Sequence, residues 1–482
     1  MPTRQAASWS SAAWRRCRVG LTEVHEGRLH ARRWGLESPR RTPSSRTELL
    51  AEGRARAREI PPSELAALAT GGRDPLGILA RQNIDRDPEL VPLRIERMSE
   101  SPFTFYRGSA AVMAADLAAS PHSGVLVASC GDAHVSNFGF YASPSRRLVF
   151  DLNDFDEAAW APWEWDVKRL VTSVLIGGAA SARDGAVVER AARQVVKTYL
   201  GAIRRAIEST PLERYFAHFD IEASRDHLDD AARRAIKKAV KDAQKRTGER
   251  AVRRITEEGE DGIRRIILRP PTTVPPPEHV IGLVHELFQD YRRSTSHDIA
   301  LLFEHFSIVD IARRVVGVGS VGTRCYLVLL QDGDGNAMLM QPKQASRSVL
   351  AEYGRVPQPK ALEQLIHTSG EGARVVALQR ILQALSDPFL GHIRSPEHDF
   401  YARQFHDMKG GIDVEDLEDE PFVTYAVACA AVLARAHAQS RPAPRIIGYA
   451  GDGEEITDAI LEWSSAYAAR SRADWEAFTA GA

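Results

Sequence analysis

The sequence predicts an α+β protein that combines long helices with a small antiparallel sheet. Residues 315–343 have the pattern of a strand, a glycine-rich turn, a second strand, a tight turn and a third strand. Two further strand-like runs stand apart from these, at residues 124–129 and 148–152. Most of the remaining chain has helical composition and spacing of apolar residues. The expected helices cover residues 109–119, 165–207, 280–296, 348–369, 375–386, 421–438 and 456–477.

Composition narrows the class of protein. The 482 residues are enough for two or three structural units or one large two-lobed domain, and 44% hydrophobic with 26% charged residues is typical of soluble proteins. Because 63 basic residues balance 64 acidic ones, charge does not indicate a nucleic-acid partner. Four scattered cysteines without a CxxC pair argue against a zinc site or a disulfide framework, and they predict a cytoplasmic protein. No apolar run reaches the roughly 18 residues of a membrane span, so no membrane partner is expected.

A cluster of acidic and amide residues at 131–157 carries the strongest chemical signal. It contains GDAHVSNFG, a strand-like run, and then FDLNDFDE. In phosphoryl transfer, one Asp takes the proton of the acceptor hydroxyl while an Asn and a second Asp hold Mg²⁺. Asn137 follows Asp132 by five residues, and Asp151 follows Asn137 by fourteen. This spacing predicts Asp132 as the general base and Asn137 and Asp151 as metal ligands.

Three further residues join this candidate site, and one choice stays open. Asp154 competes with Asp151 as the metal ligand, because Asp154-Phe-Asp-Glu resembles the Asp-Phe-Asp form seen in small-molecule kinases. His134 is a candidate for orienting the loop through hydrogen bonds. Arg107, which follows an aromatic run, is a candidate for pairing with phosphate or with the acidic cluster. A dimetal phosphoesterase built on Asp132 and His134 would need additional metal-binding segments that the sequence lacks.

A glycine-rich hairpin at 317–322 forms the second motif. It lies between two strands, so it fits neither a dinucleotide fingerprint, which needs a helix next, nor a P-loop, which needs Gly-Lys-Ser/Thr. Such a hairpin can fold over nucleotide phosphates while a lysine reaches them from the neighbouring strand. Lys343 follows the hairpin by 21 residues, at the end of the third strand. The residues expected to bind ATP are Gly317, Gly319, Ser320, Gly322 and Lys343.

The surroundings of Lys343 carry two structural expectations. Pro342 has no backbone N–H, so the strand must be an edge or be distorted at that point. A glutamate partner for the lysine is not evident, and Glu352 and Glu363 on the following helix are both open choices.

The GDAHVSN segment resembles the Gly-Asp-x-His-x-x-Asn loop of the aminoglycoside and choline phosphotransferases, in the protein-kinase-like superfamily. The resemblance implies that Asp166, at the start of a helix, ties down this loop, and that LARAH at 433–437 belongs to the helix preceding it. In those enzymes the Gly-rich hairpin comes first, whereas here it follows Asp132. The resemblance therefore implies a circularly permuted, two-lobed, kinase-like fold that uses ATP and Mg²⁺.

From about residue 50 onward the chain also resembles an uncharacterised bacterial family, domain of unknown function 2252. The segments that carry this resemblance are residues 101–108, GDAHVSNFG, FDLNDFDEA, GVGSVGTR, residues 386–391, 400–404 and 407–410, and LARAHAQS. The family supplies no reaction. The expected function therefore follows from the two motifs: transfer of the ATP γ-phosphate to a hydroxyl of a small-molecule acceptor. The alternative is a nucleotide-binding pseudokinase or regulatory module without turnover.

Composition and motifs together predict the order of parts along the chain. The leader is rich in Arg, Ser and Ala and is expected to be disordered. A run with five prolines between residues 270 and 277 is expected to be a linker. The predicted parts are the leader at 1–50, a catalytic-loop lobe with a helical insert at 51–268, the linker at 269–278, a nucleotide-binding lobe at 279–410 and C-terminal helices at 411–482 that complete the catalytic lobe.

Overall fold

The computed structural model describes residues 43–218, 247–315, 317–405 and 410–481, together with Lys237, Val240 and Lys241. Residues 46–482 belong to one compact unit. The leader expected at residues 1–50 lies outside the described part except for its end, where helix α2 (Arg46–Glu59) begins. Much of the segment 231–255, which is rich in Lys and Arg with interspersed acids, also lies outside it, and the end of this segment forms α12 (Gly248–Ile255).

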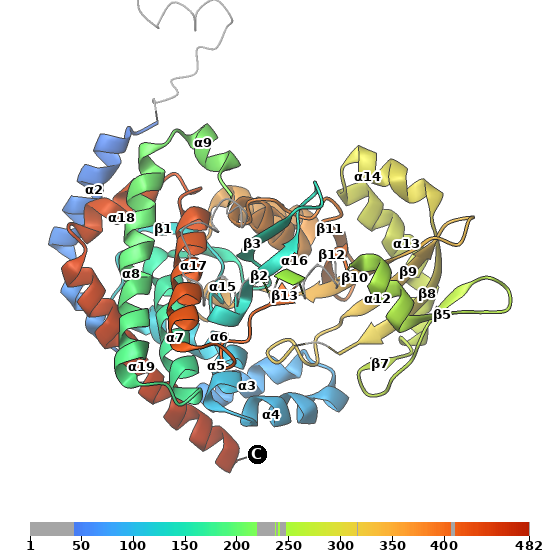
Figure 1. Ribbon diagram of the computed structural model, residues 1–482, viewed down its shortest axis with the longest axis horizontal. Coiled ribbons are helices and arrows are strands. Elements are labelled where there is room, and N and C mark those ends of the chain that lie inside the picture. The colour runs from blue at the N-terminus through green and yellow to red at the C-terminus, as the bar shows by residue number, and fades with distance from the viewer. Residues whose placement is uncertain are drawn as a thin grey trace, which may run out of the picture. The chain divides into compact units, whose positions relative to one another are not determined.

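A body of helices makes up one side of this unit, at the left of Figure 1. Its long members pack in pairs, α8 against α17 and α7 against α19. Helix α8 buries apolar residues at helical spacing, among them Val188, Ala192, Val195 and Tyr199, because one stripe of the helix faces the core. The helices of the body are α2, α3 (Pro75–Ile84), α4 (Val91–Ser99), α5 (Pro102–Gly108), α6 (Ala110–Ala119), α7 (Trp163–Ala180), α8 (Gly185–Glu208), α9 (Pro211–Phe216), α17 (Asp419–His437), α18 (Ala443–Ala450) and α19 (Glu454–Ala480).

Two small sheets lie against this body. Strand β1 (Leu126–Ser129) pairs antiparallel with β4 (Ala159–Pro162). Strand β2 (Phe138–Ala142) pairs antiparallel with β3 (Leu148–Leu152) and with β13 (Gly410–Gly411). The expected strands at 124–129 and 148–152 correspond to β1 and β3, whereas β2 and β4 were not predicted.

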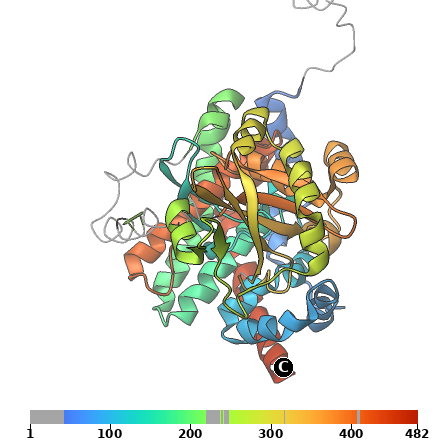
Figure 2. The same ribbon diagram turned by 90° about the vertical axis from the view of Figure 1, so that its right-hand side faces the viewer.

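A six-stranded antiparallel sheet, at the right of Figure 1, forms the other side. Helix α13 (Glu278–Ser294) lies across one of its faces, as Figure 2 shows, and is followed by α14 (His297–Leu302). Between the sheet and the body run α15 (Val349–Glu352) and α16 (Lys360–Leu382). The spatial order of the strands is β11 (Gly391–Arg394), β12 (Asp399–Gln404), β10 (Ala337–Ala345), β9 (Tyr326–Gln331), β8 (Ser307–Arg314) and β7 (Thr273–Val274). A separate hairpin pairs β5 (Thr256–Glu258) with β6 (Arg264–Ile266).

The structure bears on three expectations for this sheet. The first strand of the glycine-rich hairpin was placed too late, because β8 ends at Arg314 and the segment from 315 is loop. The Pro-rich run expected to be a linker contributes the edge strand β7, which pairs with β8. Strand β10 is interior, but its ladder with β9 stops at Met340 and resumes only as an isolated bridge between Cys325 and Lys343. Pro342 lies in that interruption, so the strand is distorted there, as a missing N–H requires.

The architecture confirms the α+β prediction. The helices expected at 165–207, 280–296, 421–438 and 456–477 correspond to α7 with α8, α13, α17 and α19, although their ends shift by a few residues. The two helices expected at 348–369 and 375–386 are wrong in their bounds, because the first begins as the short α15 and one helix, α16, then runs from Lys360 to Leu382 with a non-helical Gly370 inside it. None of the helices in the described part of the chain is both long and apolar enough to cross a membrane.

Candidate functional site

The loop that follows β1 and contains Asp132 is fixed by the buried carboxylate of Asp166. Asp166, at the start of α7, accepts the backbone N–H groups of Cys130 at 2.6 Å and Gly131 at 3.0 Å. His437, at the end of α17, lies 3.1 Å from the same carboxylate and 2.7 Å from the Tyr199 hydroxyl. The resemblance implied this role for Asp166 and this position for the LARAH segment. Because all these groups are buried, the loop has a fixed path.

Gly131 makes that path possible. Its φ is +82°, and a Cβ placed there would lie 2.1 Å from the carbonyl oxygen of Glu157. Only glycine adopts this conformation without strain and leaves room for so close an approach. The turn brings the next residue, Asp132, out beside α7.

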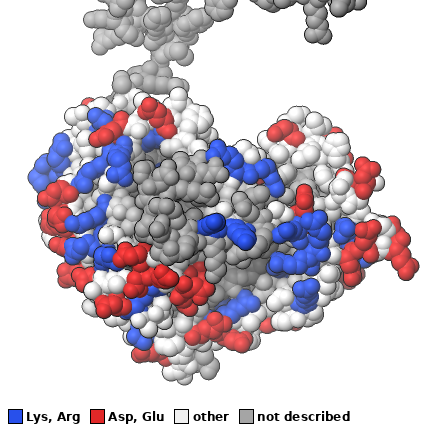
Figure 3. Space-filling model, in the orientation of Figure 1, with Lys and Arg blue, Asp and Glu red and all other residues white. Residues whose placement is uncertain are grey.

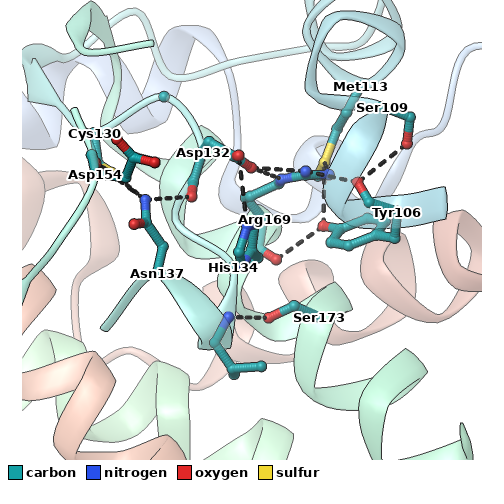
Figure 4. A network of polar contacts seen from close by, with 12 residues as sticks. Tyr106, Ser109, Met113, Cys130, Asp132, His134, Asn137, Asp154, Arg169 and Ser173 are labelled. Carbon is teal, nitrogen blue, oxygen red and sulfur yellow. Dashed lines mark hydrogen bonds and ion pairs between the residues drawn. The ribbon is translucent and has the colours of Figure 1, made fainter. Parts of the chain in front are cut away.

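Asp132 is paired with an arginine that the sequence did not single out. The Nε and Nη2 atoms of Arg169 contact the same carboxylate oxygen, Oδ1, at 2.8 and 2.7 Å. Arg169 also donates to the carbonyl oxygen of Tyr106 and stacks on its ring, 3.9 Å from the centroid (Figure 4). The arginine is thus immobilised, and it leaves the second oxygen of Asp132, Oδ2, for other partners.

Asn137 joins the two acidic segments. Its side-chain nitrogen donates to the carbonyl oxygens of Asp132 at 3.0 Å and Asp154 at 3.1 Å. The amide nitrogen is therefore committed to the backbone, and the amide oxygen is the atom left for a ligand. Figure 4 shows the Asn137 side chain reaching the loop of Asp132 on one side and Asp154 on the other.

The two competing aspartates have different environments. Asp151 is buried, and its oxygens accept the N–H groups of Leu152 and Ala384, each at 2.8 Å. Burial raises the pKa of Asp151, although Arg435 opposes that rise. Asp154 instead has a side chain that is 44% exposed and that lies 3.4 Å from Lys343 Nζ. The geometry favours Asp154 as the carboxylate available to a ligand, the reverse of the order that spacing gave.

Lys343 reaches the acidic cluster directly. Its Nζ lies 3.1 Å from Asp156, 3.4 Å from Asp154 and 3.0 Å from the Tyr401 hydroxyl. Burial disfavours its charge, but the two carboxylates outweigh burial and hold the pKa of Lys343 well above its ordinary value. Among the described residues, its ion-pair partners are these aspartates, rather than either of the two open choices, Glu352 and Glu363.

A cavity of about 580 Å³ is lined by parts of both motifs, namely Asn153 and Asp154 of the acidic cluster and Gly317, Ser320 and Lys343 of the second motif. Its lining does not include the predicted site residues Asp132, His134, Asn137 and Arg107. It lies between β10 and β12 of the sheet, the Gly-rich loop and the acidic segment after β3. Basic side chains gather on the face of the molecule shown in Figure 3, between the helical body and the sheet. Polar residues that line the cavity include Asn153, Asp154, Ser320, Gln341, Lys343, Arg146, Arg314, Arg403 and Asp387, and Gly317 also lines it.

The glycines of the loop do not share one role. Gly317, with φ of +72°, lines the cavity, and its carbonyl oxygen accepts Arg97 Nη1 at 2.6 Å. Gly319 allows close contact with α5, since a Cβ there would lie 3.2 Å from the carbonyl oxygen of Arg107. Gly322, with φ of +88°, accepts the N–H of Asp87 at 2.9 Å and lies on the other side of the sheet. The loop is therefore pinned to the helices that precede Asp132.

His134 and Arg107 both carry buried nitrogen atoms that find no hydrogen-bond partner within the described part of the chain. His134 Nε2 lies 3.6 Å from Asp132 Oδ2, and its Nδ1 has no partner among the described residues. Burial lowers the pKa of His134 to about 4, so the ring is neutral at pH 7. Six arginines in the described part have an unpartnered buried Nε, and Arg107 is the one among them that also has no hydrogen bond from its other nitrogens.

Sequence reasoning missed Arg169, Tyr401, Arg403 and Arg314. Arg169 could have been found, because it follows Asp166 by three residues on a helix and so lies on the face that meets the loop. Tyr401 and Arg403 alternate along β12, a strand that was not predicted.

Comparisons with known proteins assign the chain to a family. A family model described as an uncharacterised protein conserved in bacteria, DUF2252, matches residues 86–481. The chain belongs to this family. No curated protein and no solved structure matches it. Membership in the DUF2252 family brings no reaction with it, and the kinase-like arrangement of the chain stays a prediction.

Proposed function

We propose that this protein is an ATP- and Mg²⁺-dependent phosphotransferase that moves the γ-phosphate to a hydroxyl of a small-molecule acceptor. The observation that carries the proposal is the ion pairing of Lys343 with Asp154 and Asp156. Lys343 lies almost 190 positions after the two aspartates in the chain. Lys343 was predicted from the Gly-rich motif and Asp154 from the acidic cluster, which also contains Asp156. A lysine and carboxylate set at the edge of a glycine-lined cavity suits the handling of a metal–phosphate group.

The cavity has the charge and the backbone that a nucleotide triphosphate needs. Lys343, Arg146, Arg314 and Arg403 outnumber its lining carboxylates Asp154 and Asp387. Arginine and lysine bind phosphate oxygens by charge-assisted hydrogen bonds. Gly317 and Ser320 would present the loop backbone to the phosphates.

Mg²⁺ would be held jointly by the protein and the nucleotide. Among the described residues no group of three or more His, Cys, Asp or Glu side chains could hold a metal on its own. Mg²⁺ commonly takes only one or two protein oxygens and completes its shell with phosphate oxygens and water. The Asp154 carboxylate and the amide oxygen of Asn137 supply such a pair, and the metal would neutralise phosphate charge there.

The acceptor side is built around Asp132. Its second oxygen, Oδ2, would receive the hydroxyl proton, while Arg169 holds the other oxygen and fixes the direction of the carboxylate. Neutral His134 would orient Asp132 rather than compete for the proton. Arg107, whose guanidinium has no hydrogen-bond partner among the described residues, would take an anionic oxygen that arrives with a substrate.

The same contact between Asp132 and Arg169 favours a second candidate function. Arg169 Nε and Nη2 hold one oxygen of the Asp132 carboxylate with two charge-assisted hydrogen bonds, a structural role that does not require proton transfer. A protein that binds nucleotide without transferring phosphate, a pseudokinase or regulatory module, would tolerate such a pair.

Turnover separates the two candidates. The full chain is incubated with Mg²⁺ and γ-labelled ATP against a panel of hydroxyl-bearing metabolites, and labelled product is measured. The phosphotransferase predicts a labelled acceptor that Asp132→Asn abolishes. Nucleotide binding without any labelled product would favour the pseudokinase, and absence of nucleotide binding would exclude both.

A further inference from the structure

A second cavity, of about 350 Å³, lies on the opposite face of the six-stranded sheet from the first. Alternate residues of each strand explain this division, since side chains of a strand point to opposite faces. On β10, Gln341 and Lys343 line the first cavity, whereas Met340 and Pro342 line the second. Of the described residues expected to bind ATP or metal, Gly322 is the one that lines the second cavity, so this cavity has no part in the proposed phosphoryl transfer.

Helix α13 forms the outer wall of this second cavity. Its lining residues recur at helical spacing, as Val280, Leu283, Val284, Leu287 and Phe288. Such an apolar stripe normally packs directly on a sheet, yet Tyr291 is the one residue of α13 that is fully buried. The helix stands off the sheet and leaves an apolar space.

The C-terminal end of α13 is fixed to the sheet, so the space under the helix is not explained by a helix that fails to pack at all. Tyr291 donates to the carbonyl oxygen of Phe389 at 2.6 Å. Its ring belongs to an aromatic cluster with Phe288 and Phe303, with centroids 5.5 to 5.8 Å apart. On strand β11, a Cβ at Gly391 would lie 2.7 Å from Tyr291 and Ser294, so close packing is already reached there.

Charged and polar side chains lie at the rim of the cavity, and one of them, Arg324, is a cation that forms no ion pair with a described residue. Arg313 is paired with Asp87, and Glu397 is exposed. Arg324 donates to the Asp85 carbonyl oxygen and to Gln344, each at 3.2 Å, and it has no ion pair among the described residues. Burial and the nearby Arg324 lower the pKa of His398, so that ring is an uncharged hydrogen-bonding group at neutral pH.

We propose that this cavity binds a small amphipathic molecule with an apolar body and an anionic head group, of the kind represented by a medium-chain fatty acid. Its volume and its mostly apolar lining with few polar groups match small-molecule sites. The body lies between α13 and the sheet, and the head group meets Arg324. A peptide is a poorer fit, because both walls of the cavity are already joined at the aromatic cluster.

Calorimetric titration of the full chain with decanoate, and with decanol as the uncharged counterpart, tests the proposal. Wild type should bind decanoate at one saturable site, because the cavity joins an apolar lining to a cation. Val284→Trp fills the cavity and should weaken decanoate binding at least tenfold. Ile281→Trp is the matched control, because Ile281 lies on the exposed face of α13 outside the lining and should leave binding unchanged. Arg324→Gln should weaken decanoate binding and leave decanol binding unaltered.

Three outcomes would overturn the proposal. They are no saturable decanoate binding by wild type, equal losses in Val284→Trp and Ile281→Trp, and one-for-one displacement of decanoate by Mg-ATP, which would place it in the other cavity. Circular dichroism and thermal unfolding of each variant establish that it is folded, and the Arg324→Gln comparison remains decisive if Val284→Trp does not fold. None of the decanoate measurements depends on phosphoryl transfer, so they stand whether or not the protein is a phosphotransferase.

Discussion

At the scale of single residues, the face of a strand decides what a side chain can do, and spacing along the chain does not reveal that face. The fourteen-residue spacing from Asn137 predicted Asp151 as the metal ligand. The carboxylate of Asp151 instead accepts a hydrogen bond from the part-buried N–H of Ala384. Asp154, just beyond the strand, turns toward Lys343. Both aspartates were predicted as candidates, but choosing between them needed the three-dimensional path of the segment after β3.

A pair of alanine variants tests this assignment. Asp154→Ala should weaken Mg²⁺-dependent ATP binding at least tenfold and change stability little, because the side chain is 44% exposed. Asp151→Ala should leave ATP binding intact but lower the free energy of unfolding by about 1–3 kcal/mol, since it removes the acceptor of the buried N–H of Leu152 and of the part-buried N–H of Ala384. Calorimetry and urea unfolding measure the two effects, and the opposite pattern would restore Asp151 as the ligand.

His134 gives a pH prediction. Its folded-state pKa of about 4 lies below the ordinary value of 6.5 because burial penalises the charged ring. The unfolded chain therefore binds more protons between pH 6.5 and 4, and the contribution of His134 to stability is full above 6.5 and is lost as the pH falls to 4. In urea unfolding, His134→Gln should lose less stability than wild type across that window. Equal losses in the two proteins would show that His134 titrates normally.

At the scale of elements, the loop of Asp132 depends on three pieces of chain that meet beneath it. Strand β1 delivers the loop, α7 provides Asp166 and Arg169, and α17 provides His437. The sequence predicted β1, both helices and the tie by Asp166. The pairing of Arg169 with Asp132 was not predicted, although the position of Arg169 three residues after Asp166 placed it on the face of α7 that meets the loop.

Gly131 should be the most sensitive position of this loop. Gly131→Ala combines a left-handed φ with a clash against the Glu157 carbonyl oxygen, so we expect a loss of at least about 2 kcal/mol in unfolding free energy. Gly185→Ala is the matched control, because a Cβ at the first position of α8 meets nothing within 4 Å and alanine favours helix. That variant should be neutral or slightly more stable in urea unfolding. A Gly131→Ala protein as stable as the control would disprove the strained turn.

The strands of the large sheet show where sequence patterns were insufficient. Strands β9 and β10 were predicted from their apolar runs, but β11 and β12 were not. The sequence of β12, DFYARQ, has charged residues because Arg403 faces a cavity rather than a dry core. Functional positions in a strand thus weaken the alternating pattern on which strand prediction depends.

At the scale of the whole molecule, a buried ionic network joins distant parts of the helical body. Arg73 contacts Asp116 of α6 at 2.6 Å and Asp474 of α19 at 2.7 Å. The Tyr467 hydroxyl donates to the same Asp116. This network holds the C-terminal helix α19 beside segments from early in the chain. The prediction that residues 411–482 complete a body begun by the early segments requires contacts of this kind.

Breaking that network should be costly. Arg73→Met should lower the free energy of unfolding by about 3–5 kcal/mol, because it leaves two buried carboxylates without their cation. Arg193→Met, which removes an exposed pair with Asp458, should cost less than about 1 kcal/mol. Urea unfolding of the two variants measures the difference, and similar small losses in both would mean that the Arg73 network adds nothing beyond a surface pair.

The sequence showed the order of the two motifs along the chain, whereas their proximity in space was an expectation. The cavity that Lys343, Gly317 and Asp154 share gives that expectation a location. The acceptor could not be predicted, because the residues that surround Asp132 come from α5 and α7, which lie apart from it in the sequence.

The central claim is that Mg-ATP binds in the cavity between the Gly-rich hairpin and Asp154, and calorimetric titration of the full chain tests it most directly. Wild type should bind one Mg-ATP. Lys343→Met should bind it at least tenfold more weakly, because a charge-assisted contact of about 1.5–3 kcal/mol is removed. Lys360→Met, at the exposed start of α16, should bind like wild type. Absence of Mg-ATP binding by wild type, or equal binding by all three proteins, would contradict the account.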